Sequence, residues 1–300
     1  MRVLVTGASG QLGGYLLREL TRQESEVVAW SGSRTGQLGG VSLQPVDLAD
    51  ADRVASAFRQ ANASVVIHAG ATASVAECFR EEARAWQVNS RGTAVLAELA
   101  ERSAARLVFV STDLVFDGER GWYREPDAPS PMSVYGSTKA AAERAVLSIS
   151  TGVVARLSLL YGPSLVTRRS FFDQQLAALR ERRPITLFED EWRTPLDLPT
   201  AAQALVAIVR SDFAGTLHVG GPERMSRLEM GRKLARCLDL DPSVFQRSTR
   251  NAAPLAEPRP RDTSLDSSLW RGLFGTCSWP SLEDAIPNML AAAEGSGPNL

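Results

Sequence analysis

Two residues able to move a proton lie four positions apart, Tyr135 and Lys139. Side chains with this spacing point to the same face of a helix. A nearby ammonium stabilises a phenolate and lowers the pKa of a tyrosine from its usual value of about 10. Such a tyrosine can give a proton to a carbonyl oxygen or take one from a hydroxyl. Because the chain has only two lysines among 33 lysines and arginines, a lysine here indicates a need for a compact ammonium. Taken alone, the pair also fits an ordinary exposed helix start.

A strand-like run from Arg2 to Thr6 leads into a glycine-rich turn, Gly7-Ala-Ser-Gly10-Gln-Leu-Gly13, and then into a periodic helix. The order of strand, turn and helix is what gives a glycine pattern meaning. Gly7 can form the turn, Gly10 can let the backbone approach a pyrophosphate, and Gly13 can let helix and strand pack closely. The helix N-terminus then binds the phosphates. The expected cofactor contacts of this stretch are Gly7, Ser9, Gly10, Gln11, Leu12 and Gly13.

The end of the second strand, Glu26 to Trp30, predicts which dinucleotide binds. NAD-binding proteins normally carry an acidic residue there for the ribose 2′-hydroxyl, whereas this chain has Ser31-Gly-Ser-Arg34. The missing carboxylate removes repulsion against a 2′-phosphate, and Arg34 can pair with that phosphate. We therefore expect Ser31 and Arg34 to favour NADP(H), with NAD(H) as an alternative. Arg34 also fits an ordinary surface arginine.

Two more strand ends border the same predicted site. Asp47 and Leu48 follow a third strand and are placed to border an adenine. A fourth strand, Val65 to His68, runs into small residues that let a cofactor lie against the backbone. The expected contacts there are Ala69, Gly70 and Ala71. We interpret His68, at a strand end, and the second histidine, His218, as structural.

Polar residues also follow a fifth strand, Leu107 to Val110, at the edge of the sheet where ligands bind in such folds. They are Ser111, Thr112 and Asp113, and a hydroxyl there can donate to the same carbonyl oxygen that Tyr135 would protonate. A long helical stretch from Glu81 to Arg102 contains Asn89, a poor helix former. With Gly92 beside it, Asn89 could kink the helix or hold a water.

Alternating strands and helices predict an α/β protein with a Rossmann-type, doubly wound parallel sheet. We assign residues 1–160 to a cofactor domain, to which a helix and strand near residues 196–219 return, and 161–300 mostly to a smaller, partly interleaved C-terminal substrate-binding part. The later elements expected are a helix at 170–182, a strand at 185–188, a helix at 200–209, a strand at 215–219 and a helix at 227–238.

The bulk composition is that of an ordinary globular protein. Charges of 33 positive and 34 negative residues nearly cancel, so we expect neither nucleic acid nor membrane as a partner. The cysteines, Cys78, Cys237 and Cys277, are widely spaced, which favours a reducing compartment without a metal cluster or disulfide framework. The chain opens on a strand without a signal peptide, so we expect a cytoplasmic protein.

Several motifs together resemble an extended short-chain dehydrogenase/reductase, most closely the dTDP-4-dehydrorhamnose reductase family of sugar-nucleotide reductases. The resemblance covers nearly the whole chain. It is carried by Thr6-Gly-Ala-Ser-Gly-Gln-Leu-Gly13, Val110-Ser-Thr-Asp-Leu-Val-Phe-Asp-Gly118, Tyr135-Gly-Ser-Thr-Lys139, Arg156-Leu-Ser-Leu-Leu-Tyr-Gly162, Trp192-Arg-Thr-Pro195 and Arg259-Pro-Arg-Asp-Thr-Ser-Leu-Asp266.

The resemblance implies a role for each matching residue. Tyr135 would be the proton donor, Thr112 would orient the carbonyl, and Lys139 would hold the nicotinamide ribose and lower the tyrosine pKa. Asn89 matches the family's helix asparagine, which can serve in a proton relay. Hydride would pass from NADPH to a ketone of a nucleotide-linked sugar. The implied substrate contacts are Val115, Phe116, Phe171, Trp192 and Arg259. A homodimer would be common among such relatives.

Two departures from the family pattern bear on the expected reaction and on the expected sugar. Members that dehydrate sugars carry an Asp-Glu pair after the threonine, whereas Asp113 is followed by Leu114, which argues against a 4,6-dehydratase. Dehydrorhamnose reductases usually have a tryptophan in the sugar pocket where this chain has Leu159, so the sugar itself stays open.

Two alternatives remain at this stage. A sugar-nucleotide epimerase would use the same residues with tightly held NAD, but the absent acid at Ser31 disfavours it. A non-catalytic NADP-binding regulatory subunit, like that of methionine adenosyltransferase, would share the fold without turnover. The intact Thr112, Tyr135 and Lys139 weigh against that reading.

Overall fold

The central feature of the molecule is an eight-stranded sheet. The computed structural model describes residues 1–167, 169–252, 257–275 and 279–294. The strand order is β12-β7-β6-β5-β1-β2-β4-β3, and every neighbouring pair is parallel except β3 with β4. The strands are β1 (Arg2–Thr6), β2 (Glu26–Ser31), β3 (Gln37–Leu38), β4 (Val41–Pro45), β5 (Val65–His68), β6 (Arg106–Thr112), β7 (Gly152–Leu157) and β12 (Gly215–Val219). The order reverses at β1, which confirms the predicted doubly wound sheet.

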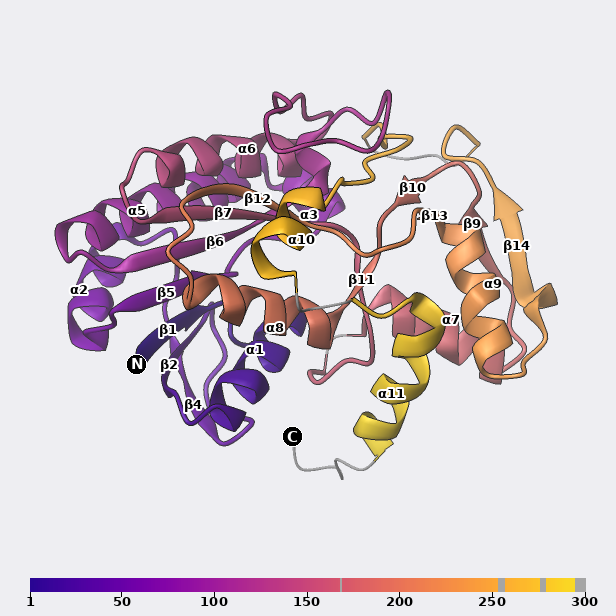
Figure 1. The fold of residues 1–300 in the computed structure, drawn as a ribbon, viewed down its shortest axis with the longest axis horizontal. Helices are drawn as coiled ribbons and strands as arrows, with labels where there is room; N and C mark the ends of the chain where they lie inside the picture. Colours follow the sequence, from indigo (N-terminus) through magenta and orange to yellow (C-terminus); the bar gives the residue numbers. More distant parts are fainter. Residues whose placement is uncertain (168, 253–256, 276–278, 295–300) are drawn as a thin grey trace.

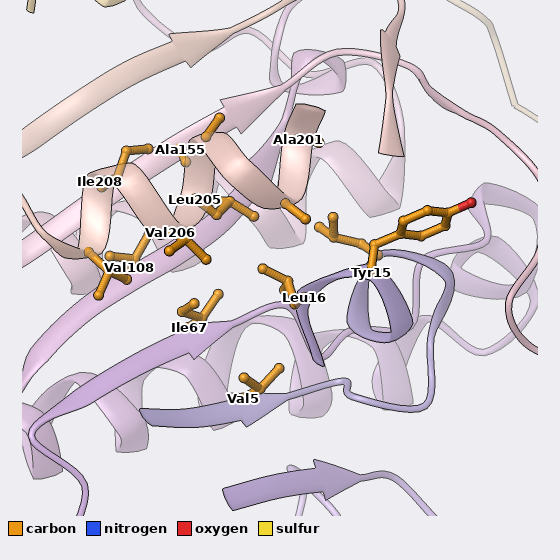
Figure 2. Close-up of a cluster of buried hydrophobic side chains, with 14 of the residues drawn as sticks. Val5, Tyr15, Leu16, Ile67, Val108, Ala155, Ala201, Leu205, Val206 and Ile208 are labelled. Carbon is orange, nitrogen blue, oxygen red and sulfur yellow. The ribbon is translucent and has the colours of Figure 1, made fainter. Parts of the chain in front are cut away.

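Helices cover both faces of this sheet (Figure 1). One face carries α1 (Gln11–Arg22), α8 (Leu198–Val209) and α10 (Ser268–Phe274), and the other carries α2 (Ala51–Ala61), α5 (Gly92–Arg102) and α6 (Val134–Leu147). Successive strand residues point to opposite faces, so a strand buried on both sides must be apolar throughout. Figure 2 shows one face, where Val5, Ile67 and Val108 of the sheet meet Leu16 of α1 and Leu205 of α8.

The starts of the helices follow from local capping. The hydroxyl of Ser133 accepts from the Gly136 amide at the start of α6, and Asp197 accepts from the Thr200 amide at the start of α8. Such caps satisfy amides that have no partner within the helix. Among the described residues no side chain caps α1, which begins after Gly10.

A second hydrophobic cluster lies beyond the carboxyl edge of the sheet. It contains α7 (Phe171–Arg180), β9 (Ile185–Phe188), α9 (Arg227–Cys237), β14 (Phe245–Ser248) and α11 (Leu282–Glu294), which gather away from α2 and α5 in Figure 1. Three two-strand ladders connect this part: β9 with β14, β8 (Leu160–Tyr161) with β11 (Leu196–Asp197), and β10 (Trp192–Arg193) with β13 (Met225–Ser226). Short 3₁₀ turns lie at Asp113–Val115 and Pro242–Val244.

The helical stretch expected between residues 81 and 102 is not one continuous α-helix. After α3 (Val75–Arg80), the chain forms α4 (Glu82–Ala85), a π-helical segment (Trp86–Arg91) and then α5. Asn89 lies in the π-helical segment, a distortion often found near functional sites. Gly92 follows it, and a Cβ there would lie 2.4 Å from the carbonyl oxygen of Leu48. The start of α5 can approach the backbone at Leu48 this closely only with glycine at position 92. Within the described chain, no helix has the length and apolar character to cross a membrane.

Candidate active site

A cavity of about 940 Å³ opens at the carboxyl edge of the sheet. It lies at the carboxyl ends of the neighbouring strands β1 and β5, where the strand order reverses and doubly wound sheets bind dinucleotides. Its volume is in the upper range of small-molecule sites. Both the glycine turn after β1 and residues of the second cluster, such as Phe171 and Arg227, contribute to its wall. The cavity therefore has room for a dinucleotide and a second ligand.

The glycine turn forms the part of the wall next to the α1 N-terminus. Gly7 has a φ of +68°, and a Cβ there would lie 2.7 Å from the carbonyl carbon of Ala69. A Cβ on Gly13 would lie 2.3 Å from the carbonyl oxygen of Gly7. These glycines let the backbone approach a ligand closely at the N-terminus of α1, where the helix dipole favours an anion, so this cradle fits a pyrophosphate. All of Gly7, Ser9, Gly10, Gln11, Leu12 and Gly13 line the cavity.

Beside the end of β2, Ser31, Arg34, Asp47 and Leu48 line the cavity as a group. The Ser31 hydroxyl donates to the Arg34 carbonyl and so shapes the turn that carries the guanidinium. Asp47 accepts two hydrogen bonds of 2.8 Å from Arg84, a residue on α4 that the sequence analysis missed. Because Asp47 is paired with Arg84, Arg34 gives the end of the cavity beside β2 a positive charge, which fits an anionic group such as a 2′-phosphate.

The small residues after β5 also line the cavity. They are Ala69, Gly70 and Ala71. The Thr6 carbonyl accepts from the Ala69 amide at 3.3 Å, and the Thr6 hydroxyl accepts from the Gly70 amide at 3.0 Å. His68 bridges Thr6 and Thr93 through its two ring nitrogens, at 2.6 and 2.9 Å. Burial lowers the pKa of His68 to about 3, so its ring is neutral. The structural role expected for His68 agrees with this arrangement.

Lys139 lies one turn after Tyr135 on α6, as the spacing predicted. Its side chain is buried and lines the cavity, and its Nζ lies 4.0 Å from the ring centre of Phe109. Within the described residues it makes no hydrogen bond or ion pair, so its donors remain for the hydroxyls of a bound ribose. Burial lowers the pKa of Lys139 to about 7, and the Glu143 carboxylate partly opposes this shift.

The pKa of Tyr135 moves opposite to the direction that the sequence predicted. Burial raises it, as do the nearby Cys78 and Asp113, while a hydrogen bond with Thr112 acts weakly against them. The expectation of a lowered pKa was wrong for the protein alone because the cost of burying a phenolate dominates. The ammonium of Lys139 is also only partly present at neutral pH, since its own pKa is about 7. Tyr135 is thus protonated and ready to donate.

Thr112, at the end of β6, lies at the cavity beside Tyr135. Its hydroxyl accepts from the Leu114 amide at 3.2 Å and donates to Asp113 at 3.3 Å. The Asp113 carboxylate is buried and held by Ser158 at 3.1 Å and Arg193 at 3.3 Å. Segments distant in the chain therefore fix the carboxylate that orients the Thr112 hydroxyl.

Asn89 does not line the cavity as far as the described residues show. Its side chain binds the backbone of Thr72 at 2.8 and 3.0 Å and donates to Thr138 at 3.0 Å. These contacts tie the π-helical segment to the first turns of α6. The side-chain amide of Asn89 is thus already bound to protein groups, and a relay through this residue stays a prediction.

The residues expected on the substrate side divide into two groups. Phe171 and Arg259 line the cavity, whereas Val115, Phe116 and Trp192 are absent from its described lining. Val115 and Phe116 are fully buried, and Phe116 stacks on Tyr123 with ring centres 4.1 Å apart. Trp192 packs under Arg224, whose Cζ lies 4.2 Å from the ring centre. The expectation is corrected for Val115 and Phe116, because the turn after β6 sends both side chains into the core. Trp192 is half-buried, and its contact with a substrate stays a prediction.

Three arginines around one buried glutamate were missed by the sequence analysis. Glu191 pairs with Arg193, Arg227 and Arg259, each at 3.2 Å. Burial alone would raise the pKa of Glu191, but the three arginines hold it at about 2. Arg227 also lies over the ring of Phe171, at 4.7 Å. Arg193 also pairs with Asp113, so three guanidiniums face two carboxylates and this wall of the cavity still favours an anionic ligand. The Arg-rich run near Arg259 was the only signal for it in the sequence.

Comparison with known proteins gives consistent matches along the chain. Residues 1–294 match the family described as RmlD substrate binding domain. A probable low-salt glycan biosynthesis reductase, Agl14, of Haloferax volcanii is 30% identical over 296 residues, covering 97% of this chain and 98% of that protein. A dTDP-4-dehydrorhamnose reductase of Streptomyces griseus is 31% identical, covering 97% of this chain and 95% of that protein.

A solved structure shows the same fold. The dTDP-4-dehydrorhamnose reductase of Bacillus anthracis, in complex with NADP, superposes with a TM-score of 0.85 at 24% identity. The match covers 97% of this chain and 99% of that chain. At this level of identity the likeness establishes the Rossmann-like architecture.

Proposed function

This chain belongs to the RmlD substrate binding domain family, and from that premise we propose that it is an NADPH-dependent reductase of a nucleotide-linked 4-keto-sugar. It is an NAD(P)-dependent oxidoreductase of the short-chain dehydrogenase/reductase type, like the reductases to which it is similar. The observation that carries the proposal is that a single cavity is lined by the glycine turn, by Thr112, Tyr135 and Lys139, and by Arg259.

The cofactor would be held by residues of known position around the cavity. The amides after Gly10 would take the pyrophosphate, Arg34 the 2′-phosphate, and Lys139 the ribose hydroxyls next to the nicotinamide. Asp47, Leu48 and the residues from Ala69 to Ala71 would border the adenosine and its linkage. NADPH, when bound, supplies a hydride for the ketone carbon. NADPH is the preferred cofactor in this proposal, with NADH as a weaker one.

The protein's part in the reaction is to hold the ketone and to move one proton. The Thr112 hydroxyl, which donates to Asp113 in the protein alone, would turn its proton to the ketone oxygen and so fix the direction of that oxygen. Tyr135, whose pKa is raised by burial and is therefore protonated, would donate its phenolic proton to that oxygen as negative charge develops there. The Lys139 ammonium would stabilise the phenolate that remains. Catalysis then rests on position and electrostatics.

Residues 1–160, together with the returning segment 196–219, would bind the cofactor, and residues 161–300 would mostly bind the substrate. The pairing of β12 with β7 supports the return of the later segment to the sheet. On the substrate side, Phe171 and Arg259 would contact the nucleotide-linked sugar. A homodimer and a cytoplasmic location, both implied by the sequence, complete the proposal.

The test is consumption of NADPH, with NADH in parallel, against a panel of nucleotide-linked 4-keto-sugars. Turnover with one of them, faster with NADPH, supports the proposal. A protein purified with tightly bound NAD that interconverts sugar epimers instead would identify the epimerase alternative. Tight NADPH binding without turnover on any sugar, together with a co-purifying protein, would identify the regulatory alternative.

A further inference from the structure

A row of polar side chains crosses the sheet beneath α6. Ser111 on β6 stands opposite Arg156 on β7, and Arg156 stands opposite His218 on β12. Residues paired in this way across parallel strands point to the same face. All three are buried, on a face that otherwise carries an apolar core. Buried polar groups in such a place need partners.

The partner of this row is Glu143 on α6. Its Oε1 accepts from the Ser111 hydroxyl at 2.5 Å and from Arg156 Nε at 3.0 Å, and its Oε2 accepts from Arg156 Nη2 at 2.8 Å. The exposed fraction of Glu143 is 2% and that of Arg156 is 3%. His218 completes the row. Its Nδ1 donates to the Tyr123 carbonyl at 3.0 Å, which leaves Nε2 to accept from Arg156 at 3.3 Å. The carboxylate of Glu143 is therefore fixed in place.

Glu143 lies one helical turn after Lys139, as Lys139 lies one turn after Tyr135. The three residues follow one another along a single stripe of α6. On β6, Phe109 contacts Lys139 and Ser111 contacts Glu143, and these two strand residues share a face. Through these two contacts, β6 fixes the Lys139 ammonium and the Glu143 carboxylate one helical turn apart along α6.

Three further titratable groups around Lys139 carry no negative charge at neutral pH. His68 on β5 is neutral because burial lowers its pKa to about 3. Cys78 on α3 stays a thiol because burial raises its pKa to about 11. Burial likewise raises the pKa of Tyr135 and keeps it a phenol. Arg156 on β7 adds positive charge. Among these described neighbours, Glu143 alone supplies a negative charge.

We propose that Glu143, locked by Ser111 and Arg156, is a positioning residue that sets the charge state of Lys139 and so controls when the catalytic lysine is an ammonium. The inference rests on the proposed role of Lys139, but it concerns a property of the protein without any ligand. Removing the carboxylate destabilises the ammonium. Without the Arg156 guanidinium, the negative charge of Glu143 is no longer offset by this cation, so the Lys139 ammonium is stabilised. The two changes therefore act in opposite directions.

The two lysines of this chain make a direct measurement possible. Protein labelled with ¹³C at lysine Cε gives one signal for each lysine, and each signal shifts when its amine loses a proton. Lys233 is an internal control, because it pairs with Glu223 and Glu283 far from this network. Lys233→Arg assigns the two signals.

In the wild type, the signal of Lys139 should titrate near pH 7. Glu143→Gln should lower its midpoint by about one pH unit or more, the size expected when a neighbouring opposite charge is removed. Arg156→Met should raise the midpoint, while the signal of Lys233 stays unchanged in both variants. A purely structural role for Glu143 predicts no such opposite shifts.

Unchanged midpoints in both variants, or shifts in the same direction, would overturn the proposal. Circular dichroism establishes that each variant is folded. If Glu143→Gln does not fold, Arg156→Met decides alone: a raised midpoint supports the proposal, and an unchanged or lowered one contradicts it. Since the titration uses neither NADPH nor sugar, its result is independent of whether the proposed reductase reaction is found.

Discussion

Arg34 donates a hydrogen bond of 2.9 Å to the hydroxyl of Thr167, which joins the loop after β2 to the segment before α7. The loop that the sequence linked to the ribose phosphate is thereby tied to a segment whose continuation, Ser170 and Phe171, lines the cavity. In the part of the chain that the structure describes, one neutral hydroxyl holds the guanidinium, which remains able to pair with a phosphate.

The first prediction follows from this position. Arg34→Ser should weaken NADPH binding by about 10- to 100-fold, because a hydrogen bond to a charged group is worth about 1.5–3 kcal/mol. NADH, which lacks the 2′-phosphate, should bind within about twofold of the wild type. Titration calorimetry with both cofactors measures the ratio. Equal losses for NADPH and NADH would show that Arg34 does not read the phosphate.

A second prediction concerns the glycine turn. Gly13→Ala should destabilise the protein and abolish NADPH binding, because its Cβ would lie 2.3 Å from the Gly7 carbonyl oxygen and 2.5 Å from that of Ala8. Backbone atoms cannot move aside as a side chain can. The matched control is Gly272→Ala on α10, where a Cβ meets nothing within 4 Å. Thermal unfolding with and without NADPH should separate the two variants. Similar behaviour of both would contradict the close approach of α1 to the turn.

The pKa of Lys139 gives a third prediction. In the protein alone this pKa is lowered to about 7, so the ammonium is lost as pH rises above that value. If ribose hydroxyls and cofactor charge favour the ammonium, NADPH binding above pH 7 must take up a proton. Calorimetry at pH 8 in two buffers of different ionisation enthalpy should show uptake of close to one proton per NADPH. Lys139→Met should abolish the uptake; uptake retained in this variant would assign the proton elsewhere.

Stability should fall at mildly acid pH because of the two histidines. Burial lowers the pKa of His68 and of His218 from 6.5 to about 3 in the folded protein. Between pH 6.5 and about pH 3, the unfolded chain binds protons at these two histidines and the folded chain does not. The free energy of unfolding therefore decreases as pH falls below 6.5. The two sites together should cost about 3 kcal/mol between pH 6.5 and 5.

Urea unfolding at these two pH values measures the loss. His68→Gln keeps hydrogen-bonding capacity but cannot take up the proton, so it should remove about half of the pH dependence. A pH dependence equal to that of the wild type would show that His68 is not held neutral.

Much of the sheet could be predicted because its strands are short apolar runs with clear ends. The expected strands at Val65–His68, Ile185–Phe188 and Gly215–Val219 have these bounds in the structure. The π-helical segment around Asn89 could not be predicted, because it depends on contacts with Thr72 and Thr138 rather than on local propensity. Tertiary contacts override propensity in this way.

Within the site, local motifs placed Tyr135 and Lys139 correctly on one helix, but they did not give the direction of the Tyr135 pKa. That direction depends on burial, which the sequence does not state. The motif containing Val115 and Phe116 likewise does not say which side faces the cavity. The cluster of Glu191 with its arginines joins positions up to 68 residues apart in sequence, so no local pattern reveals it.

The measurement that tests the central claim most directly follows a labelled hydrogen atom. The protein is incubated with NADPH carrying deuterium at the transferred position and with a nucleotide-linked 4-keto-sugar, and the product is analysed by mass spectrometry. The account predicts one deuterium on the carbon of the former ketone, formed by the wild type and about 10²- to 10⁴-fold more slowly by Tyr135→Phe. NADPH affinity should stay close to that of the wild type in this variant. A product without deuterium, or equal rates for the two proteins, would contradict the account.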